Sequence, residues 1–172
     1  MQRILYIFIW LSRITHCRGF GVQSPTDYWF VRHVVNEHGL YYQYDSVGCQ
    51  DDWLTRKLGR LYFRLANWKQ PKMIFSDDYR EYLHAGCLKS VFGDRGELIH
   101  LSLVGCDDSS LPSLFNKVND DTLLIVEGIH QYPSLWRQLL ADERVRVTFD
   151  LYYCGLVFFD KKRYKQNYII NF

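Results

Sequence analysis

From Lys72 onward, short apolar runs alternate with stretches of helical spacing, and this alternation constrains the fold more than any other feature. The segments expected to form strands are 73–76, 98–104, 122–127, 145–152, 156–159 and 168–172. A strand–helix–strand–helix order predicts a parallel sheet that is covered by helices on both faces. The run LLIV at 123–126 is apolar without alternation, which is typical of a strand buried on both sides.

The end of the chain departs from this pattern. Only Cys154 and Gly155 mark the break between its two strand-like runs, so a helical crossover does not fit, and we expect an antiparallel hairpin. The final run would add one more strand after a basic turn, Lys161-Lys162-Arg163. We interpret that turn as a solvated hairpin tip, with phosphate binding as the alternative.

Helical signals dominate residues 1–70. Ser24 and Pro25 are a typical helix start, and Phe30, Val31, Val34 and Val35 then form an apolar stripe. A later helix is expected to begin near Asp51 or Asp52 and to end before Pro71. Its inner face would consist of Leu54, Leu58, Leu61, Tyr62 and Leu65.

An apolar stretch near the N-terminus needs a separate interpretation. The residues Ile4, Ile7, Phe8, Leu11 and Ile14 have helical spacing, and the run is far shorter than the roughly 20 residues of a membrane span. No small-residue cleavage site follows it. We expect an amphipathic helix that packs on its own domain or on a partner. Docking on a membrane surface is less favoured, because its polar face has few Lys or Arg residues.

Composition limits the class of protein. A chain of 172 residues with 48% hydrophobic residues predicts one globular domain, with a helical region at 1–70 and an α/β core at 71–172. The net charge of +2 is spread over both signs, which argues against a nucleic-acid surface. Five cysteines, without C-x-x-C pairs or metal-ligand spacing, argue against disulfides and zinc and favour the reducing cytoplasm.

Four stretches resemble a known group of proteins. They are 18–31 (RGFGVQSPTDYWFV), 60–75 (RLYFRLANWKQPKMIF), 122–130 (TLLIVEGIH) and the C-terminal part 145–172. Together they are similar to bacterial class I S-adenosylmethionine-dependent methyltransferase-like proteins. The resemblance implies a three-layer αβα, Rossmann-like fold, with an antiparallel strand inserted beside the last parallel strands.

The loop after the first strand departs from that family. Its members carry an acidic residue and glycines there, E-x-G-x-x-x-G, so that the backbone approaches the cofactor closely. This chain instead has Ser76, Asp77, Asp78, Tyr79 and Arg80, which add negative charge and bulk. We expect Ser76 or Asp77 to cap the following helix without a ligand.

The segment between Asp78 and Glu97 is short for the family. It has room for one helix and a turn, whereas each parallel strand pair needs a crossover of roughly a dozen residues. A complete second and third strand therefore do not both fit. Residues 88–92 either continue a helix or form a short strand, and the half of the sheet that would hold adenosine is expected to be reduced or missing.

The next two strand ends depart as well. Relatives carry Asp-Gly-Asn-His and Asp-Asp-Ile-His-Trp, where this chain has Gly105-Cys106-Asp107-Asp108 and Glu127-Gly128-Ile129-His130. If Asp107, Glu127 and His130 converge at the carboxyl edge of the sheet, they suit a divalent metal or proton transfer. The favoured interpretation is plainer: Asp107 and Asp108 cap a helix, and the other two residues are ordinary loop residues.

These observations favour a non-catalytic member of the methyltransferase-like group, a pseudoenzyme that has lost S-adenosylmethionine and acts as a binding or scaffold protein. A homodimer or an intact methyltransferase relative would cover the exposed sheet edge. No catalytic residue, metal, nucleic acid or membrane span is expected. Any cofactor would lie in a cleft formed by Ser76, Asp77, Asp78, Asp107, Glu127 and His130.

Two alternatives stay open. The first is an active S-adenosylmethionine-dependent methyltransferase for a small molecule, with Asp77 or Asp78 binding the ribose and with Glu127 and His130 handling the substrate. The second is a small-ligand binding domain that uses the old cleft, in which the aromatic loop at 40–45 (LYYQYD) stacks on a ring.

Overall fold

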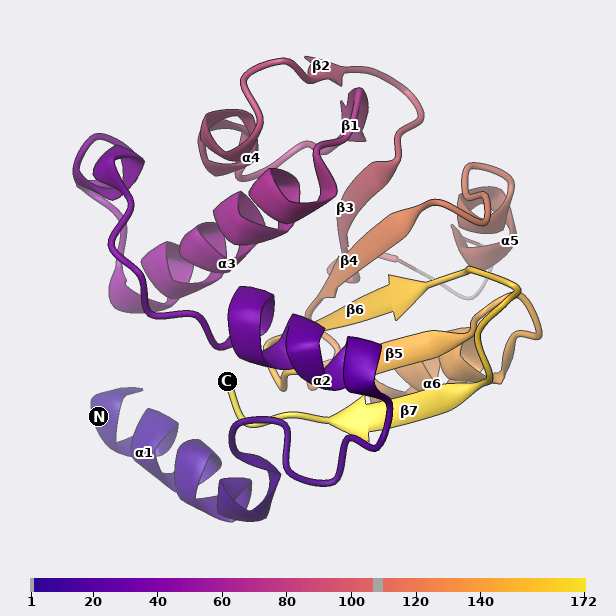
Figure 1. Cartoon of the computed structure of the whole chain (residues 1–172), viewed down its shortest axis with the longest axis horizontal. Helices are drawn as coiled ribbons and strands as arrows, with labels where there is room; N and C mark the ends of the chain where they lie inside the picture. Colours follow the sequence, from indigo (N-terminus) through magenta and orange to yellow (C-terminus); the bar gives the residue numbers. More distant parts are fainter. Residues whose placement is uncertain (1, 107–109) are drawn as a thin grey trace.

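The computed structural model describes residues 2–106 and 110–172, which form a seven-stranded sheet with helices on both faces (Figure 1). The strand order across the sheet is β2-β1-β3-β4-β6-β5-β7. The strands are β1 (Met73–Phe75), β2 (Val91–Phe92), β3 (Leu98–Ser102), β4 (Leu123–Glu127), β5 (Val147–Asp150), β6 (Cys154–Phe158) and β7 (Gln166–Ile169).

Most strand pairs are parallel, as the sequence predicts. Strand β1 pairs in parallel with β2 and β3, β3 with β4, and β5 with β7. Strand β6 lies between β4 and β5 and is antiparallel to both, which confirms the hairpin. The hairpin turn lies at 151–153 instead of at Cys154 and Gly155, which belong to β6.

The segment between β1 and β3 is as short as expected. It contains one helix, α4 (Arg80–Gly86), and the two-residue strand β2 at the edge of the sheet. Residues 76–97 therefore supply one short strand where a longer chain would have room for two, and the ambiguous run at 88–92 ends in a strand.

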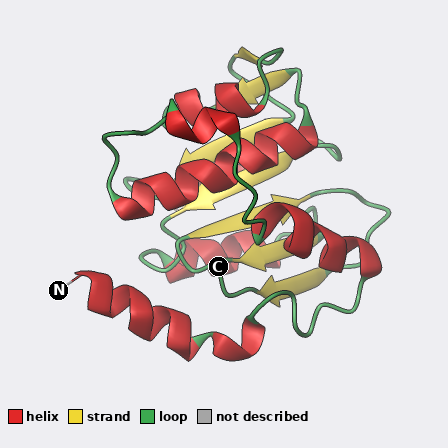
Figure 2. Cartoon of the chain, turned by 60° about the vertical axis from the view of Figure 1, so that its left-hand side comes forward, coloured by secondary structure: helices red, strands yellow, loops and turns green. Residues whose placement is uncertain are grey.

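Two hydrophobic clusters lie on the two faces of the sheet. Helices α2 (Pro25–Phe30), α3 (Trp53–Lys69) and α4 cover one face, and α5 (Ser110–Phe115) and α6 (Pro133–Ala141) cover the other (Figure 2). In β4, Leu123 and Ile125 belong to the first cluster, and Leu124 and Val126 belong to the second. The three-layer arrangement thus explains why LLIV lacks alternation.

The predicted starts of α2 and α3 are confirmed. The Ser24 hydroxyl accepts a hydrogen bond from the backbone N–H of Asp27 at 3.3 Å, with Pro25 in the first turn. Asp52 accepts from the N–H groups of Leu54 and Thr55 at 2.7 and 3.0 Å. The helix of α2 continues as a wider turn over Val31–Val35, and the predicted apolar stripe is buried.

The apolar face expected for the first helix, α1 (Gln2–Ser12), is not the face that packs on its own domain, and its packing on a partner stays a prediction. Ile7, Phe8, Leu11 and Ile14 are each about half or more exposed. The residues that pack inward are Tyr6 and Ile9. The residues from Ile4 to Leu11 of α1 are all apolar or aromatic, so periodicity alone does not select its buried side.

Specific contacts select the face of α1 instead. The Tyr6 ring stacks on Trp53 with ring centroids 4.6 Å apart. Arg13 pairs with Asp150 at 2.6 Å, and the Asn171 amide donates to the carbonyl of Trp10 at 3.0 Å. Within residues 2–106 and 110–172, no helix is long and apolar enough to cross a membrane.

Candidate functional site

Three polar side chains meet where β1, β3 and β4 reach the carboxyl edge of the sheet. Ser76 directly follows β1, His100 lies in β3, and Glu127 is the last residue of β4. Ser76 Oγ is 3.0 Å from His100 Nδ1, and His100 Nε2 is 3.6 Å from Glu127 Oε1. Because Ser76 and His100 are only 5% and 2% exposed, this chain of polar groups lies inside the protein.

Two tyrosines cover the polar side chains. The hydroxyl of Tyr62, from α3, donates to Glu127 Oε1 at 2.5 Å, and the Tyr62 ring centroid is 5.0 Å from that of His100. Tyr79 precedes α4, and its ring meets Tyr62 edge-on at 4.9 Å and lies 5.5 Å from His100. The aromatic rings therefore occupy the space above the strand ends.

The surroundings keep the phenols of Tyr62 and Tyr79 and the thiol of Cys154 protonated. Burial raises the pKa of Tyr62 well above its ordinary value, and the nearby Cys154 and Glu127 raise it further. Burial, followed by the charge of Glu127, also raises the pKa of Tyr79 and of the Cys154 thiol. The phenols are therefore hydrogen-bond donors at neutral pH, and Cys154 is an inert buried thiol.

The backbone turns sharply before α4. Tyr79 has φ 56°, in the left-handed region that non-glycine residues seldom adopt. The Ser76 hydroxyl donates to the carbonyl of Asp78, so the His100 Nδ1–H donates to Ser76 Oγ. The prediction that Ser76 or Asp77 caps α4 is therefore wrong: the position before the helix is Tyr79, and no side chain caps it.

The six candidate residues fall into different places. Ser76 and Glu127 belong to the buried chain of polar groups, whereas Asp77 and Asp78 are exposed. His130 stacks on Tyr152 with ring centroids 4.7 Å apart, and burial lowers its pKa. Asp107, with its neighbour Asp108, lies outside the described residues, so their predicted role stays a prediction.

No protein-family model, curated protein or solved structure matches this chain. The resemblance to methyltransferase-like proteins therefore stays a prediction from the sequence motifs.

Sequence reasoning missed two members of the site, His100 and Tyr62, and named Tyr79 only as bulk in the loop after the first strand. Tyr62 fits the apolar stripe of α3, so it was interpreted as a core residue. His100 carried a usable signal, because a histidine inside an apolar strand, LIHLS, needs a polar partner when it is buried.

The order Ser76–His100–Glu127 is formally that of a nucleophile, a base and an orienting carboxylate. Its geometry does not support that use, because the serine hydroxyl is buried and already donates to Asp78. Among the described residues, no group of three or more His, Cys, Asp or Glu is placed to hold a metal ion. The arrangement instead fits two buried pairs of polar groups, Ser76 with His100 and Tyr62 with Glu127, which help to position β1, β3, β4 and α3. Among the described residues, His100 Nε2 has no hydrogen-bond partner.

Proposed function

We propose that this chain is a methyltransferase-like α/β protein that has lost S-adenosylmethionine binding and works by binding a partner. The observation that carries the proposal is the filled carboxyl edge at β1, β3 and β4. A nucleoside cofactor in such a fold needs backbone N–H groups at close range just after the first strand. Here, Tyr62 is fully buried in that region, and Tyr79 lies over His100.

Two features of the sheet support the same proposal. Strand β6 is inserted antiparallel between β4 and β5, which is the arrangement that the methyltransferase resemblance implies. Strand β2, which would carry the residues around the ribose, has only two residues. The sheet thus has the antiparallel insertion at β4, β6 and β5, but its β2 side is shortened. We expect this combination in a methyltransferase-like protein that no longer binds the cofactor.

The β2 edge is the proposed partner surface. Leu88, Val91 and Met73 are 70%, 64% and 43% exposed along it. The N-terminal helix does not cover this edge: α1 lies at the opposite end of the molecule, where Cys17 forms a bridge with Asn171 (Figure 1). A second subunit, either another copy or an intact relative, is therefore the proposed cover.

Calorimetric titration of the purified protein with S-adenosylmethionine and S-adenosylhomocysteine tests the loss of the cofactor. We expect no heat of binding and no thermal shift at millimolar ligand. A ligand at 100 times its Kd stabilises the protein by about 2.7 kcal/mol, which a thermal shift detects easily. Micromolar binding of either compound would overturn the proposal and restore the active-enzyme alternative.

Light scattering on a size-exclusion column tests the partner surface. We expect a dimer that Val91→Lys converts to a monomer, while Lys162→Glu, an exposed change in the turn before β7 at the other edge of the sheet, leaves it intact. A monomer at all concentrations would exclude the homodimer and leave the heterologous partner to be sought.

The aromatic loop at 40–45 gives the small-ligand alternative less support. Tyr41 and Tyr44 pack their rings on Phe63 at 4.9 and 5.2 Å, and Tyr44 is buried. The rings of Tyr41 and Tyr44 therefore pack against Phe63 and are not free to stack on a ligand. Tyr42 is 96% exposed and remains available to a ligand.

A further inference from the structure

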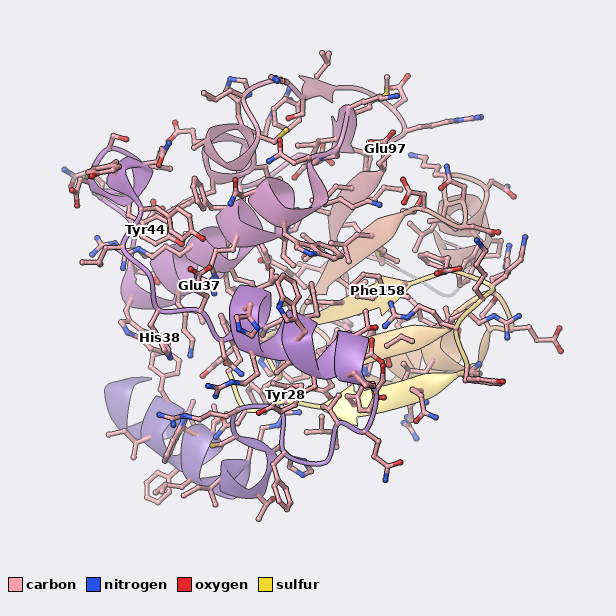
Figure 3. The ribbon with its side chains drawn as sticks, viewed as in Figure 1. Tyr28, Glu37, His38, Tyr44, Glu97 and Phe158 are labelled. Atoms are coloured by element: carbon pink, nitrogen blue, oxygen red, sulfur yellow. The ribbon has the colours of Figure 1, made fainter. Side chains whose placement is uncertain are left out.

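We propose that a basic groove and an adjoining apolar pocket, between α1 and α3, together bind a single-chain amphiphile with an anionic head. The basic groove has a volume of about 920 Å³, and the apolar pocket has a volume of about 410 Å³. Figure 3 shows Tyr44, Glu37 and His38 one below another on the side of the molecule between α3 and α1. All three line the groove.

The groove carries positive charge that the protein does not neutralise. Its basic side chains are Arg18, Arg32, Arg56, Lys57, Arg60 and Arg64. In the part of the chain that the structure describes, none of these forms an ion pair with an Asp or Glu side chain. The one acidic residue in the lining, Glu37, accepts a hydrogen bond from Tyr41 at 2.7 Å.

Some of these cations have structural roles, and others are free to bind. Arg64 donates to the carbonyls of Val34 and Val35 at 2.7 and 2.8 Å, which leaves its charge uncompensated. Arg32 and Arg18 make no such contacts among the described residues. A further donor, Asn36 Nδ2, is buried at this groove and has no acceptor. An anionic head with several oxygens, a phosphate above all, matches this set of donors.

The apolar pocket continues the groove. Trp10, Trp53, Lys57, Asn171 and Phe172 line both spaces. Beyond them, the pocket is lined mainly by apolar and aromatic side chains: Tyr6, Ile7, Ile9, Leu151, Tyr152 and Tyr153. Its volume is in the range of small-ligand sites, which typically combine apolar walls with a few polar groups.

Lys57 marks the junction of the two spaces. Its ammonium donates to the carbonyl oxygen of Phe172 at 2.8 Å and lies 5.0 Å from the Trp53 ring centroid. Burial lowers the pKa of Lys57 to about 8, so an anion beside it would recover part of the lost solvation. Arg13, in the pocket wall, has a buried Nη1 without a partner. An amphiphile would place its anionic head among the arginines of the basic groove, and its alkyl chain would pass Trp10 and Trp53 into the apolar pocket.

This site is separate from the carboxyl edge, because Ser76, His100 and Glu127 line neither space. The inference therefore goes beyond the proposed function and does not depend on it. A protein that fails to bind S-adenosylmethionine would still be expected to bind the amphiphile, and each result is measured separately.

Calorimetry with three probes tests the site: n-decyl phosphate below its critical micelle concentration, inorganic phosphate, and the neutral n-decyl glucoside. We expect decyl phosphate to bind at least tenfold more tightly than either of the others. Equal affinity for the glucoside, or for inorganic phosphate, would overturn the proposal, because one half of the site would then contribute nothing. Binding only to vesicles that contain anionic lipid, and not to the monomeric probe, would overturn it as well.

Matched variants test the two halves. Arg18→Gln/Arg32→Gln should weaken decyl phosphate binding at least fivefold, whereas Lys89→Gln/Lys162→Gln, with the same change in charge elsewhere, should not. In α1, Ile7→Asn should weaken binding by a similar factor, since Ile7 lines the pocket, while Phe8→Asn serves as its control. Both α1 residues are more than half exposed, so neither change should prevent folding, which a thermal midpoint checks. If a variant and its control weaken decyl phosphate binding equally, the assignment of that half of the site would be overturned.

Discussion

The phenol of Tyr62 donates a 2.5 Å hydrogen bond to Glu127 Oε1, which ties the middle of α3 to the end of β4. The same carboxylate oxygen lies 3.6 Å from His100, which in turn contacts Ser76 after β1. One hydrogen bond thus joins α3 to β4, and another joins β3 to the residue after β1, whereas His100 Nε2 has no hydrogen-bond partner among the described residues. In a buried setting, each of these hydrogen bonds stabilises the fold only while both groups keep their partner.

Replacing Tyr62 by Phe should therefore be costly for a change of one oxygen atom. The Glu127 side chain is 18% exposed, and it would lose its hydroxyl donor while staying mostly shielded from water. We expect the free energy of unfolding to fall by about 1–3 kcal/mol, measured by urea denaturation. Tyr164→Phe is the control, because Tyr164 is 89% exposed and should change stability by less than about 0.5 kcal/mol.

Asp52, before α3, should contribute more to stability than Asp77 and Asp78, before α4. Asp52→Ala removes three hydrogen bonds to the first turn of α3, two from backbone N–H groups and one from the Thr55 hydroxyl, and should cost about 1 kcal/mol. Asp77→Ala/Asp78→Ala should cost less than about 0.5 kcal/mol, because neither side chain caps α4. Chemical denaturation of both variants decides this, and a larger loss for the double variant would favour the capping role that the sequence suggested.

The order of strands and helices was predictable because it depends on local signals. Ser24 with Pro25, and Asp52 before an apolar stripe, mark helix starts through hydrogen bonds that span only a few residues. The short spacer of Cys154 and Gly155 excluded a crossover by chain length alone. Strand β4 was recognisable because a strand in the middle of a three-layer fold has no polar face.

The site was less predictable because it depends on which strands become neighbours. Ser76, His100 and Glu127 are far apart in the sequence and meet only because β3 lies between β1 and β4. The buried face of α1 was missed for a related reason. Its choice depends on Trp53 and Asp150, which lie far along the chain and carry no signal within α1 itself.

A glycine in the middle of α3 gives a test of close packing. Alanine at a helix interior normally stabilises by about 1 kcal/mol relative to glycine. At Gly59, however, a Cβ atom would lie 2.4 Å from Tyr82 Cε2. We expect Gly59→Ala to destabilise by about 1–3 kcal/mol. In a Tyr82→Ala background the same change should stabilise, and an unchanged sign in the two backgrounds would contradict this packing.

The ion pair between Arg13 and Asp150 should matter more than one at the surface. Its side chains are 12% and 30% exposed, and it joins the residue directly after α1 to β5. Arg13→Leu should lower stability by about 1–3 kcal/mol and speed amide hydrogen exchange in α1. Arg144→Gln breaks a pair in which the arginine is 51% exposed, and it should cost at most about 1 kcal/mol. Unchanged exchange in α1 would show that Tyr6 and Ile9 hold the helix without the pair.

Lys57 predicts a change of stability with pH whose sign is fixed. Its pKa falls from the ordinary 10.5 to about 8, chiefly because burial disfavours the charged form. Between these values the unfolded chain binds more protons than the folded one, so this lysine makes the protein more stable as pH rises. The free-energy cost of burying the charged Lys57 is fully present below pH 8 and amounts to at most about 3 kcal/mol.

The Lys57→Met variant has no such cost. The wild type should therefore gain stability relative to the variant from pH 8 to 10, measured by urea denaturation at each pH. Tyrosines and cysteines titrate in both proteins and cancel in the difference. Lys89→Met, at an exposed site, should show a constant difference, and a constant difference for Lys57→Met would mean that its ammonium stays in water.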